Sequence, residues 1–449
     1  MSDGGFSLTE AISIALGGMI GGGIYAVLGV VTQITGAATW FAFVLAGIVA
    51  LSAAYSYIGL NELVADQDGQ GGGSVTFVQS FTGNSDIAGM VGWTLLVGYI
   101  GSMAMYAFAF GEFAVALPLV PAAVAGLPLR PIISALAVAG FVGLNLLGTR
   151  ATGSTENVLV SVKVVILVAL GIGGVLYAVT ISTEPVQFGT DQFTTVSPIM
   201  AAAISFVAFQ GWQLLFYDQE SMDDPLDQIP TAIYIAIPVA VFIYVVVAVA
   251  TFALAPLALQ AHPHTALTEA ASTIAGVVGL AAVGGVVLSV SALFSTGSAI
   301  NATLFSAGYF AKGMLSDDLL PDRVGDSSVS GVPSRTLLLL GLVTVVFTIY
   351  GSLEAITSFA SLAFIVVFGS MSALAFSRRD SDQIHPVPPA VGVVGTIGFF
   401  ILMFYHLYVA ERGTFYAVLL IAVAILAVEA LYFERRVIEE KIPYIQPES

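Results

Sequence analysis

Cysteine is absent from this 449-residue chain, and charged residues make up only 9% of it, against roughly 25% in soluble domains. The lack of cysteine excludes disulfide bonds and thiolate metal sites. Hydrophobic residues make up 57%, and apolar runs of about 20 residues, long enough to cross a bilayer, recur along the chain. The composition excludes a soluble globule and indicates a polytopic membrane protein.

Histidine is rare, and of the four histidines only His262 and His264 are close in sequence. They flank a proline, and we interpret them as part of a solvated loop rather than a metal site. The sequence offers no combination of nucleophile, base and metal ligands typical of an enzyme. We expect no enzymatic activity, no cofactor or metal, and no nucleic-acid partner.

Lysine is limited to Lys163, Lys312 and Lys441, and the formal net charge is −17. The acidic residues fall mostly in the connections between apolar runs. Acidic, lysine-poor surfaces suit concentrated salt, in which their self-repulsion is screened. The charge pattern predicts a halophilic source, and we expect an archaeon; a variant that merely has acidic loops is the alternative.

Twelve apolar runs predict an all-α protein that forms one transmembrane domain over residues 1–449. We expect the first run to be retained as a membrane span, and the longer runs to tilt or to continue beyond the bilayer. The runs lie near residues 8–34, 38–61, 88–118, 131–148, 154–181, 196–217, 229–255, 275–314, 335–351, 355–376, 389–408 and 414–434.

Basic residues in the connections predict the orientation, because cytoplasmic loops carry an excess of Lys and Arg. With the N-terminus inside, nine basic residues fall on the cytoplasmic side and two, Arg130 and Arg412, outside. Both termini are therefore expected in the cytoplasm and the protein in the cell membrane. We expect residues 67–82 to form a cytoplasmic interfacial turn and helix. The nine are Arg150, Lys312, Arg323, Arg335, Arg378, Arg379, Arg435, Arg436 and Lys441.

Five glycines interrupt the middle of the first run, in the segment Gly17-Gly18-Met19-Ile20-Gly21-Gly22-Gly23. Glycine costs roughly 1 kcal/mol per helix position relative to alanine. Exposed backbone inside a membrane is tolerated only where protein or a water-filled cavity surrounds it. The run predicts a helix broken at mid-membrane; close packing of small residues four apart is the alternative.

The sixth run contains a second candidate break, where Ser205, Gln210, Gly211 and Gln213 lie among large apolar side chains. Broken helices at corresponding positions in two halves of a transporter indicate a binding site at the membrane midplane. The first and sixth spans correspond if spans 1–5 and 6–10 are inverted repeats. Polar residues lining an ordinary bundle seam are the alternative.

Two such breaks would suit an amino acid zwitterion, because half-helix ends expose amides at one terminus and carbonyls at the other. We predict that the carboxylate binds the amides of Gly21, Gly22 and Gly23 and the ammonium binds carbonyls near Ile20, Phe206 and Ala208. The remaining predicted contacts, with the substrate side chain, are Phe209, Gln210, Trp212, Met103 and Tyr106.

Lys163 is the only lysine inside an apolar run. A charge at the bilayer centre costs about 2.5–3.5 kcal/mol even on the lenient insertion scale, so an ionisable group there indicates function. Because desolvation disfavours its charged form, we predict that Lys163 relays protons. Snorkelling toward the inner membrane surface is the alternative.

The eighth run adds Ser295 and Thr296, which we expect to form a polar pocket with Lys163 beside the first break. Hydroxyls that merely cap carbonyls of their own helix are the alternative. A lysine ammonium in such a pocket would replace the ion of a sodium-coupled transporter. The pattern favours the proton as the coupling ion.

The glycine segment continues as Ile24-Tyr25 and Leu28-Gly29, and it resembles the first-helix signature of amino acid permeases of the amino acid-polyamine-organocation (APC) superfamily. The stretch from Glu220 to Pro225 and the following Ile229-Pro230-Thr231-Ala232-Ile233 resemble the start of that family's helix 7. Lys163 matches the helix 5 lysine of proton-coupled members. Residues 295–301 and 319–321 resemble the end of helix 8 and the following loop.

The resemblance implies a five-plus-five inverted repeat with discontinuous helices 1 and 6, two additional helices, alternating access and an amino acid bound between helices 1 and 6. The repeats would span 8–181 and 196–376, with the extra helices in 389–434. Many members carry an acid after the helix 6 core, where this chain has Gln210-Gly211-Trp212-Gln213. We therefore expect a neutral substrate.

The expected function is proton-coupled uptake of a neutral amino acid across the lipid bilayer. An exchanger of amino acids or amines is the alternative within the same class. A transporter-like sensor that binds an amino acid without moving it is a third possibility. The sequence leaves the particular amino acid, the stoichiometry and the oligomeric state open.

Overall fold

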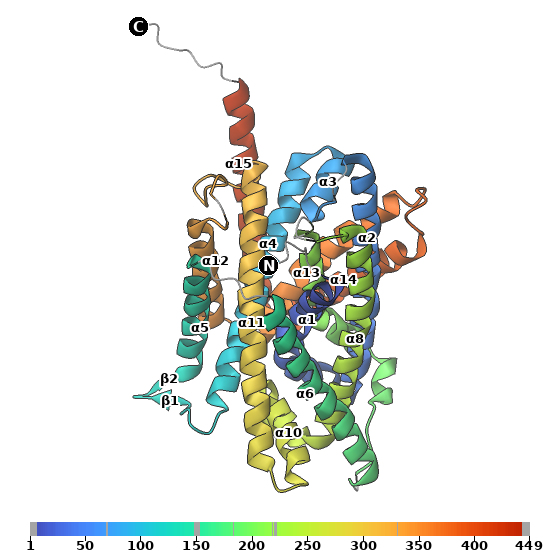
Figure 1. Ribbon diagram of the computed structural model, residues 1–449, viewed down its shortest axis with the longest axis vertical. Coiled ribbons are helices and arrows are strands. Elements are labelled where there is room, and N and C mark those ends of the chain that lie inside the picture. The colour runs from blue at the N-terminus through green and yellow to red at the C-terminus, as the bar shows by residue number, and fades with distance from the viewer. Residues whose placement is uncertain are drawn as a thin grey trace.

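Helices dominate the computed structural model, which describes residues 7–68, 71–147, 153–182, 184–217, 219, 222–329 and 331–441 (Figure 1). The first part of the chain comprises α1 (Leu8–Thr35), η1 (Gly36–Ala38), α2 (Thr39–Asp68), α3 (Ser74–Thr82), α4 (Ser85–Val115), the hairpin strands β1 (Ala123–Val124) and β2 (Leu127–Pro128), α5 (Leu129–Leu146) and α6 (Gly153–Thr180).

The second part contains both long helices and short connecting ones. It comprises η2 (Thr190–Thr194), α7 (Ser197–Ser205), η3 (Phe206–Phe209), η4 (Trp212–Tyr217), α8 (Pro225–Leu254), α9 (Pro256–Ala261), η6 (Pro263–Thr265), α10 (Ala266–Gly276), α11 (Ala281–Ser316), α12 (Ser334–Tyr350), α13 (Leu353–Ser377), α14 (Val387–Ala410) and α15 (Arg412–Lys441).

Nine segments of the described chain are long and apolar enough to cross a membrane, which supports a multi-pass membrane protein. One of them, spanning 60 residues, consists of α1 and α2, separated by η1. Two shorter apolar helices lie at Ser334–Tyr350 and Arg412–Ala424. Each of the twelve expected apolar runs overlaps at least one described helix; residue 148 of the fourth run lies outside the described residues.

The expected run 275–314 is wrong at its start, because α10 ends at Gly276 and α11 begins at Ala281. Gly279, with φ of 77°, adopts the left-handed conformation in the turn between them. At 1.5 Å per residue, the 36 residues of α11 extend about 54 Å. This length exceeds the hydrocarbon thickness, so α11 must tilt or project beyond it.

The expected break in the first span is wrong, because α1 is continuous from Leu8 to Thr35. Its start is well specified: the Ser7 Oγ accepts from the Glu10 amide at 3.4 Å, and the Glu10 Oε2 accepts from the Ser7 amide at 2.8 Å. Its end is at Gly36, whose φ is 55°. The five glycines lie inside the helix, and four of them allow close packing, as described below.

The sixth span is interrupted as expected. The α-helix α7 ends at Ser205, η3 continues to Phe209, and Gln210 adopts an extended conformation before η4 begins. Gly211 has φ of 127°, a conformation that residues with a Cβ rarely adopt. The glycine therefore permits the chain to change direction at this point.

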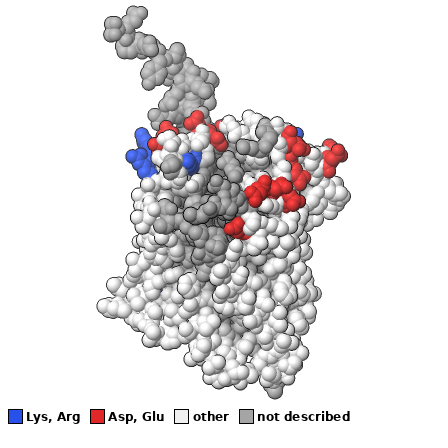
Figure 2. Space-filling model, viewed as in Figure 1, with Lys and Arg blue, Asp and Glu red and all other residues white. Residues whose placement is uncertain are grey.

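The helix expected in the interfacial segment is present as α3, preceded by Gly73 and ended by Gly83 with φ of 65°. Residues 69–70 of that segment lie outside the described residues. On the face drawn in Figure 2, basic and acidic side chains gather at the end of the molecule where α3 lies. Elsewhere on that face, the described surface consists of residues other than Lys, Arg, Asp and Glu, as expected for a body embedded in a bilayer.

Candidate functional site

Four glycines of α1 form the surface against which the neighbouring helices pack. A Cβ added at Gly18 would lie 2.7 Å from the Gly211 Cα, and one added at Gly21 would lie 2.7 Å from the Ala299 Cβ. At Gly23 an added Cβ would lie 2.6 Å from the Tyr244 hydroxyl. These separations are shorter than real Cβ contacts, so the glycines allow close approach by α8, α11 and the interrupted segment.

Gly22 faces the ring of Tyr106, and a Cβ at this position would overlap that ring. The Tyr106 hydroxyl accepts a hydrogen bond from the Gln210 Nε2. Tyr106 from α4 thus joins the glycine face of α1 to the break between η3 and η4. All three residues are buried.

Side chains from three helices reach carbonyl oxygens in the glycine segment. The Lys163 Nζ of α6 donates to the Gly17 carbonyl at 3.3 Å, and the Ser295 Oγ of α11 donates to the Ile20 carbonyl at 3.3 Å. The Tyr244 hydroxyl of α8 lies 2.6 Å from the Met19 carbonyl and 2.9 Å from the Ala208 carbonyl. Since a hydroxyl has one proton, the two carbonyls share one donor.

The backbone of the break is stabilised by polar side chains. The Ser361 Oγ of α13 donates to the Ile204 carbonyl at 2.6 Å and accepts from the Val207 amide at 3.0 Å. The Gly211 amide donates to the Gln213 Oε1 at 2.7 Å. These contacts satisfy backbone groups released where α7 ends, a requirement inside a membrane protein.

The zwitterion geometry predicted for Gly21, Gly22 and Gly23 needs correction. Their amides lie within the continuous helix α1 rather than at a half-helix terminus. The glycines allow neighbouring helices to pack closely and do not break the helix. The carbonyls of Ile20 and Ala208 do accept hydrogen bonds, from the hydroxyls of Ser295 and Tyr244 respectively.

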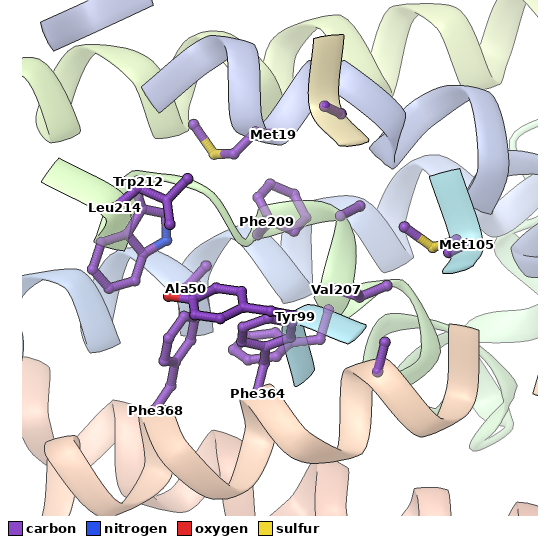
Figure 3. Packing of buried hydrophobic residues seen from close by; sticks show 14 of the residues in the cluster. Met19, Ala50, Tyr99, Met105, Val207, Phe209, Trp212, Leu214, Phe364 and Phe368 are labelled. Atoms are coloured by element: carbon purple, nitrogen blue, oxygen red, sulfur yellow. The ribbon is translucent and has the colours of Figure 1, made fainter. Parts of the chain in front are cut away.

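Trp212 and Phe206 pack against aromatic residues of α2 and α13. Trp212 packs against Tyr57 and Phe368, with ring centroids 5.1 and 5.0 Å apart, and Phe206 packs against Phe368 at 5.8 Å. Figure 3 shows Trp212 and Leu214 at one end of the interrupted segment and Phe209 farther along it. We call the group Tyr57, Phe77, Trp212, Phe216 and Phe368 the inner aromatic cluster.

Phe209 instead packs against Tyr244, with ring centroids 5.2 Å apart, beside the shared Ala208 carbonyl. Met103 is buried on α4, three residues before Tyr106. Thr296 bonds to the Ala292 carbonyl of its own helix at 2.7 Å, which is the alternative use of such a hydroxyl. Ser295 reaches α1, whereas Thr296 stabilises α11.

A second set of contacts lies at the opposite end of α1, at η6; we call it the η6 contact, formed by Gly29, Pro263, Phe108, Arg130 and His264. A Cβ at Gly29 would overlap the Pro263 carbonyl, so η6 packs directly on α1. Phe108 lies between the Arg130 guanidinium, 3.8 Å from its ring centroid, and the His264 ring, 5.8 Å away between centroids. Figure 1 places this region near the hairpin and α10, away from α3.

Two ion pairs accompany the η6 contact. Arg130 lies 3.8 Å from a carboxylate oxygen of Glu112, and the His264 Nε2 lies 3.7 Å from a carboxylate oxygen of Glu354. They connect α4 to α5 and η6 to the start of α13. All four groups are partly exposed, so each pair contributes little stability.

Sequence reasoning did not identify Tyr244 and Ser361, which both contact the break. A signal was present for Tyr244, since it is a polar aromatic residue in the middle of the Val- and Ala-rich stretch of α8. Ser361 lies among several serines and threonines of α13, and the sequence alone does not single it out.

Comparison with known proteins shows a clear family. Residues 6–428 match a family model described as amino acid permease. The chain is 28% identical to the inner membrane transport protein YbaT of Escherichia coli over 392 residues, covering 87% of this chain and 86% of that protein. An uncharacterized protein of Methanocaldococcus jannaschii is 28% identical over 437 residues, covering 95% of this chain and 94% of that protein.

A mammalian protein is also similar over part of the chain. The b(0,+)-type amino acid transporter 1 of Mus musculus is 23% identical over 273 residues, covering 59% of this chain and 54% of that protein. The family and these named relatives are transporters, not enzymes.

Proposed function

Because this chain belongs to the amino acid permease family, a family of transporters, we propose that it takes up neutral amino acids together with protons by alternating access. The observation that carries the proposal is the meeting of α1 with the interrupted segment. There, buried donors from α6, α8 and α11 reach backbone carbonyls of both elements.

We propose that the substrate ammonium binds the carbonyls that Tyr244 and Ser295 contact in this structure. An ammonium has three donors and can serve the Met19 and Ala208 carbonyls at once, whereas the Tyr244 hydroxyl has one proton. The substrate carboxylate would lie toward Tyr106 and Gln210, whose hydroxyl and amide groups are donors. Binding then requires the Tyr106 ring to move away from Gly22.

The uncharged break supports a neutral substrate. Its polar side chains are those of Gln210 and Gln213, both fully buried, and neither carries charge. A second ammonium on the substrate would need a buried anionic partner. We therefore propose that the substrate side chain is apolar or uncharged and contacts Phe209.

The position of Lys163 supports proton coupling. Its Nζ is buried, at 4% exposure for the residue, and donates to the Gly17 carbonyl of α1. Loss of its proton would remove the charge-assisted form of this contact, which links its protonation to the position of α1. Because the Lys163 Nζ contacts a carbonyl inside the bundle, snorkelling of this side chain toward the inner membrane surface is disfavoured.

The inner aromatic cluster and the η6 contact fit alternating access, because they lie on either side of the break along α1. Each would have to open in turn while the other stays closed. We further propose twelve membrane spans, inverted repeats over 8–181 and 196–376, and two additional helices over 389–434. We propose a cell-membrane location with both termini in the cytoplasm, on the side of α3.

Uptake into proteoliposomes tests the function. Radiolabelled neutral amino acids should accumulate in empty vesicles when the outside is more acidic than the inside. Exchange that requires internal substrate would instead support an antiporter, and saturable binding without flux would support a sensor. Either result would contradict proton-coupled uptake.

The Lys163→Met variant tests the coupling separately. It should bind substrate and catalyse counterflow, yet lose accumulation driven by a pH gradient. Lys312→Met is the matched control, because Lys312 is only half-buried and donates to the carbonyl of Val329 in a loop, away from α1. Unchanged pH dependence in Lys163→Met would remove this residue from the mechanism.

A further inference from the structure

A cavity of about 300 Å³ lies between α6 and α11, and Lys163 is one of the residues that line it. Six of its ten lining residues are apolar, and the others are Lys163 and three serines of α11. The volume falls at the lower end of the range of roughly 300–1,000 Å³ typical of small-molecule sites. The apolar lining residues are Val162, Ile166, Val286, Val287, Val290 and Phe294.

The mouth of the cavity lies on the outer surface of the bundle, within two candidate membrane spans. Val162 of α6 is 52% exposed, and Phe294 of α11 is 62% exposed. Both residues lie inside segments that are long and apolar enough to cross the bilayer. The cavity therefore opens toward lipid hydrocarbon rather than toward water.

The floor of the cavity is polar, but its polar groups are directed into the bundle. Lys163 bonds to the Gly17 carbonyl, the Ser295 hydroxyl bonds to the Ile20 carbonyl, and Ser291 lies 3.0 Å from the Tyr25 hydroxyl. An occupant would thus meet mainly methyl, methylene and ring groups. Apolar cavities of this kind exclude water and accept apolar ligands.

We propose that this cavity binds one acyl chain of a membrane lipid. The apolar walls and the mouth in hydrocarbon favour a chain over a headgroup, whose charge is costly at this depth. A second copy of the protein fits poorly, because helices that associate in membranes use small residues that allow close approach. The mouth instead presents valine and phenylalanine around a hollow.

The bound chain has a consequence that rests on the proposed proton coupling. It covers Lys163 on the side of the cavity, so that water reaches the amine only through the transport pathway. Emptying the cavity would give the amine a second route to water. Such a route would dissipate the proton gradient without moving substrate.

Photolabelling in nanodiscs tests the binding itself. The probe is a phosphatidylcholine with a diazirine within its acyl chain, and labelled peptides are identified by mass spectrometry. Peptides that contain residues 162–166 and 286–298 should carry several-fold more label than other lipid-facing peptides. Uniform labelling of all exposed helices, or crosslinks between two copies at these peptides, would overturn the proposal.

Two variants with opposite effects make the test specific. Val290→Trp should fill the cavity and lower labelling of these peptides several-fold, and Val287→Ala should enlarge it and raise labelling. Leu176→Trp is the matched control, since Leu176 is an exposed residue of α6 that does not line the cavity. Equal labelling in wild type, Val290→Trp and Val287→Ala would refute the site.

The labelling result does not depend on transport, so the two proposals fail separately. A third variant, Val290→Asp, separates them, because its carboxylate disfavours an acyl chain without filling the cavity. If lipid binding is correct and proton coupling is wrong, Val290→Asp loses label but shows the proton leak of wild type. If both are correct, Val290→Asp also raises proton leak into proteoliposomes, measured with a pH-sensitive dye in the absence of substrate, whereas Val290→Trp, which fills the cavity, does not.

Discussion

The contact between Gly22 and Tyr106 gives a direct test of why α1 is rich in glycine. In the variant Gly22→Ala the new methyl group would overlap the buried Tyr106 ring, which is also held by Gln210. Overpacking of this kind costs about 1–3 kcal/mol. Alanine recovers up to roughly 1 kcal/mol through its helix propensity, so we expect a net loss of stability.

The size of the loss can be expressed as a change in thermal midpoint. With average unfolding entropies, each kcal/mol corresponds to roughly 1 °C for a chain of this length. Gly22→Ala should therefore lower the midpoint of the purified protein by about 1–2 °C. Gly173→Ala is the matched control, because an added Cβ there meets nothing within 4 Å; its midpoint should stay constant or rise slightly.

A double-mutant cycle assigns the effect to Tyr106. The single variant Tyr106→Ala loses about 3–5 kcal/mol through the cavity that it leaves. Adding Gly22→Ala to that background should no longer cost stability and should gain up to roughly 1 kcal/mol from helix propensity, which gives a coupling energy of about 1–3 kcal/mol. An additive double variant, or a Gly22→Ala protein as stable as Gly173→Ala, would refute the packing explanation.

The remaining predictions concern the break, its tyrosine, the topology and the surface charge. Gly211→Ala should lower the thermal midpoint more than Gly22→Ala, because it combines a φ of 127° with an overlap on Gly18; an unchanged midpoint would contradict the strained turn. Tyr244→Phe should lose about 1–3 kcal/mol because buried carbonyls lose their donor, whereas Tyr405→Phe, at an exposed position, should be neutral in the same melting assay. In this cysteine-free chain, Ser328→Cys should react with an impermeant maleimide only from the cytoplasmic side and Ala125→Cys only from outside, and the reverse pattern would contradict the orientation. The acidic surface should make the fold more stable in molar potassium chloride than in dilute buffer, and a lower midpoint in high salt would refute a halophilic adaptation.

The membrane-spanning helices were predictable because hydrocarbon imposes length and apolarity on every span. The break in the sixth span was predictable for a similar reason. Polar side chains and glycine are costly inside an unbroken membrane helix unless released backbone groups need them as hydrogen-bond partners. This span contains Gln210, Gly211 and Gln213. The structure shows the need, since Gln213 accepts from the Gly211 amide. Local chemistry and local structure agree at this position.

The first span was wrongly predicted because glycine has two uses that sequence does not separate. A break and a close contact both require the missing Cβ, and the choice depends on what lies opposite. Opposite Gly22 is Tyr106, 84 positions later in the chain, and opposite Gly18 is Gly211. Tertiary packing determines which residue lies opposite each glycine. The residue pattern within one span carries no information about those partners.

Trp212 shows the same limit for side-chain direction. Its sequence position, next to Gly211, suggested a contact with substrate. The extended backbone of Gln210 and the unusual φ of Gly211 direct its ring to Tyr57 and Phe368 instead. A residue that follows an irregular turn therefore cannot be assigned to a face by counting.

The continuous α1 also changes how its glycines serve a transport site. A helix that stays hydrogen-bonded still has a second lone pair on each carbonyl, and without Cβ atoms the neighbouring helices come close enough to reach those oxygens. Lys163, Tyr244 and Ser295 do so at Gly17, Met19 and Ile20. Packing and polar binding are therefore not alternatives in this segment: the close approach creates the set of carbonyl contacts that a substrate ammonium would have to replace.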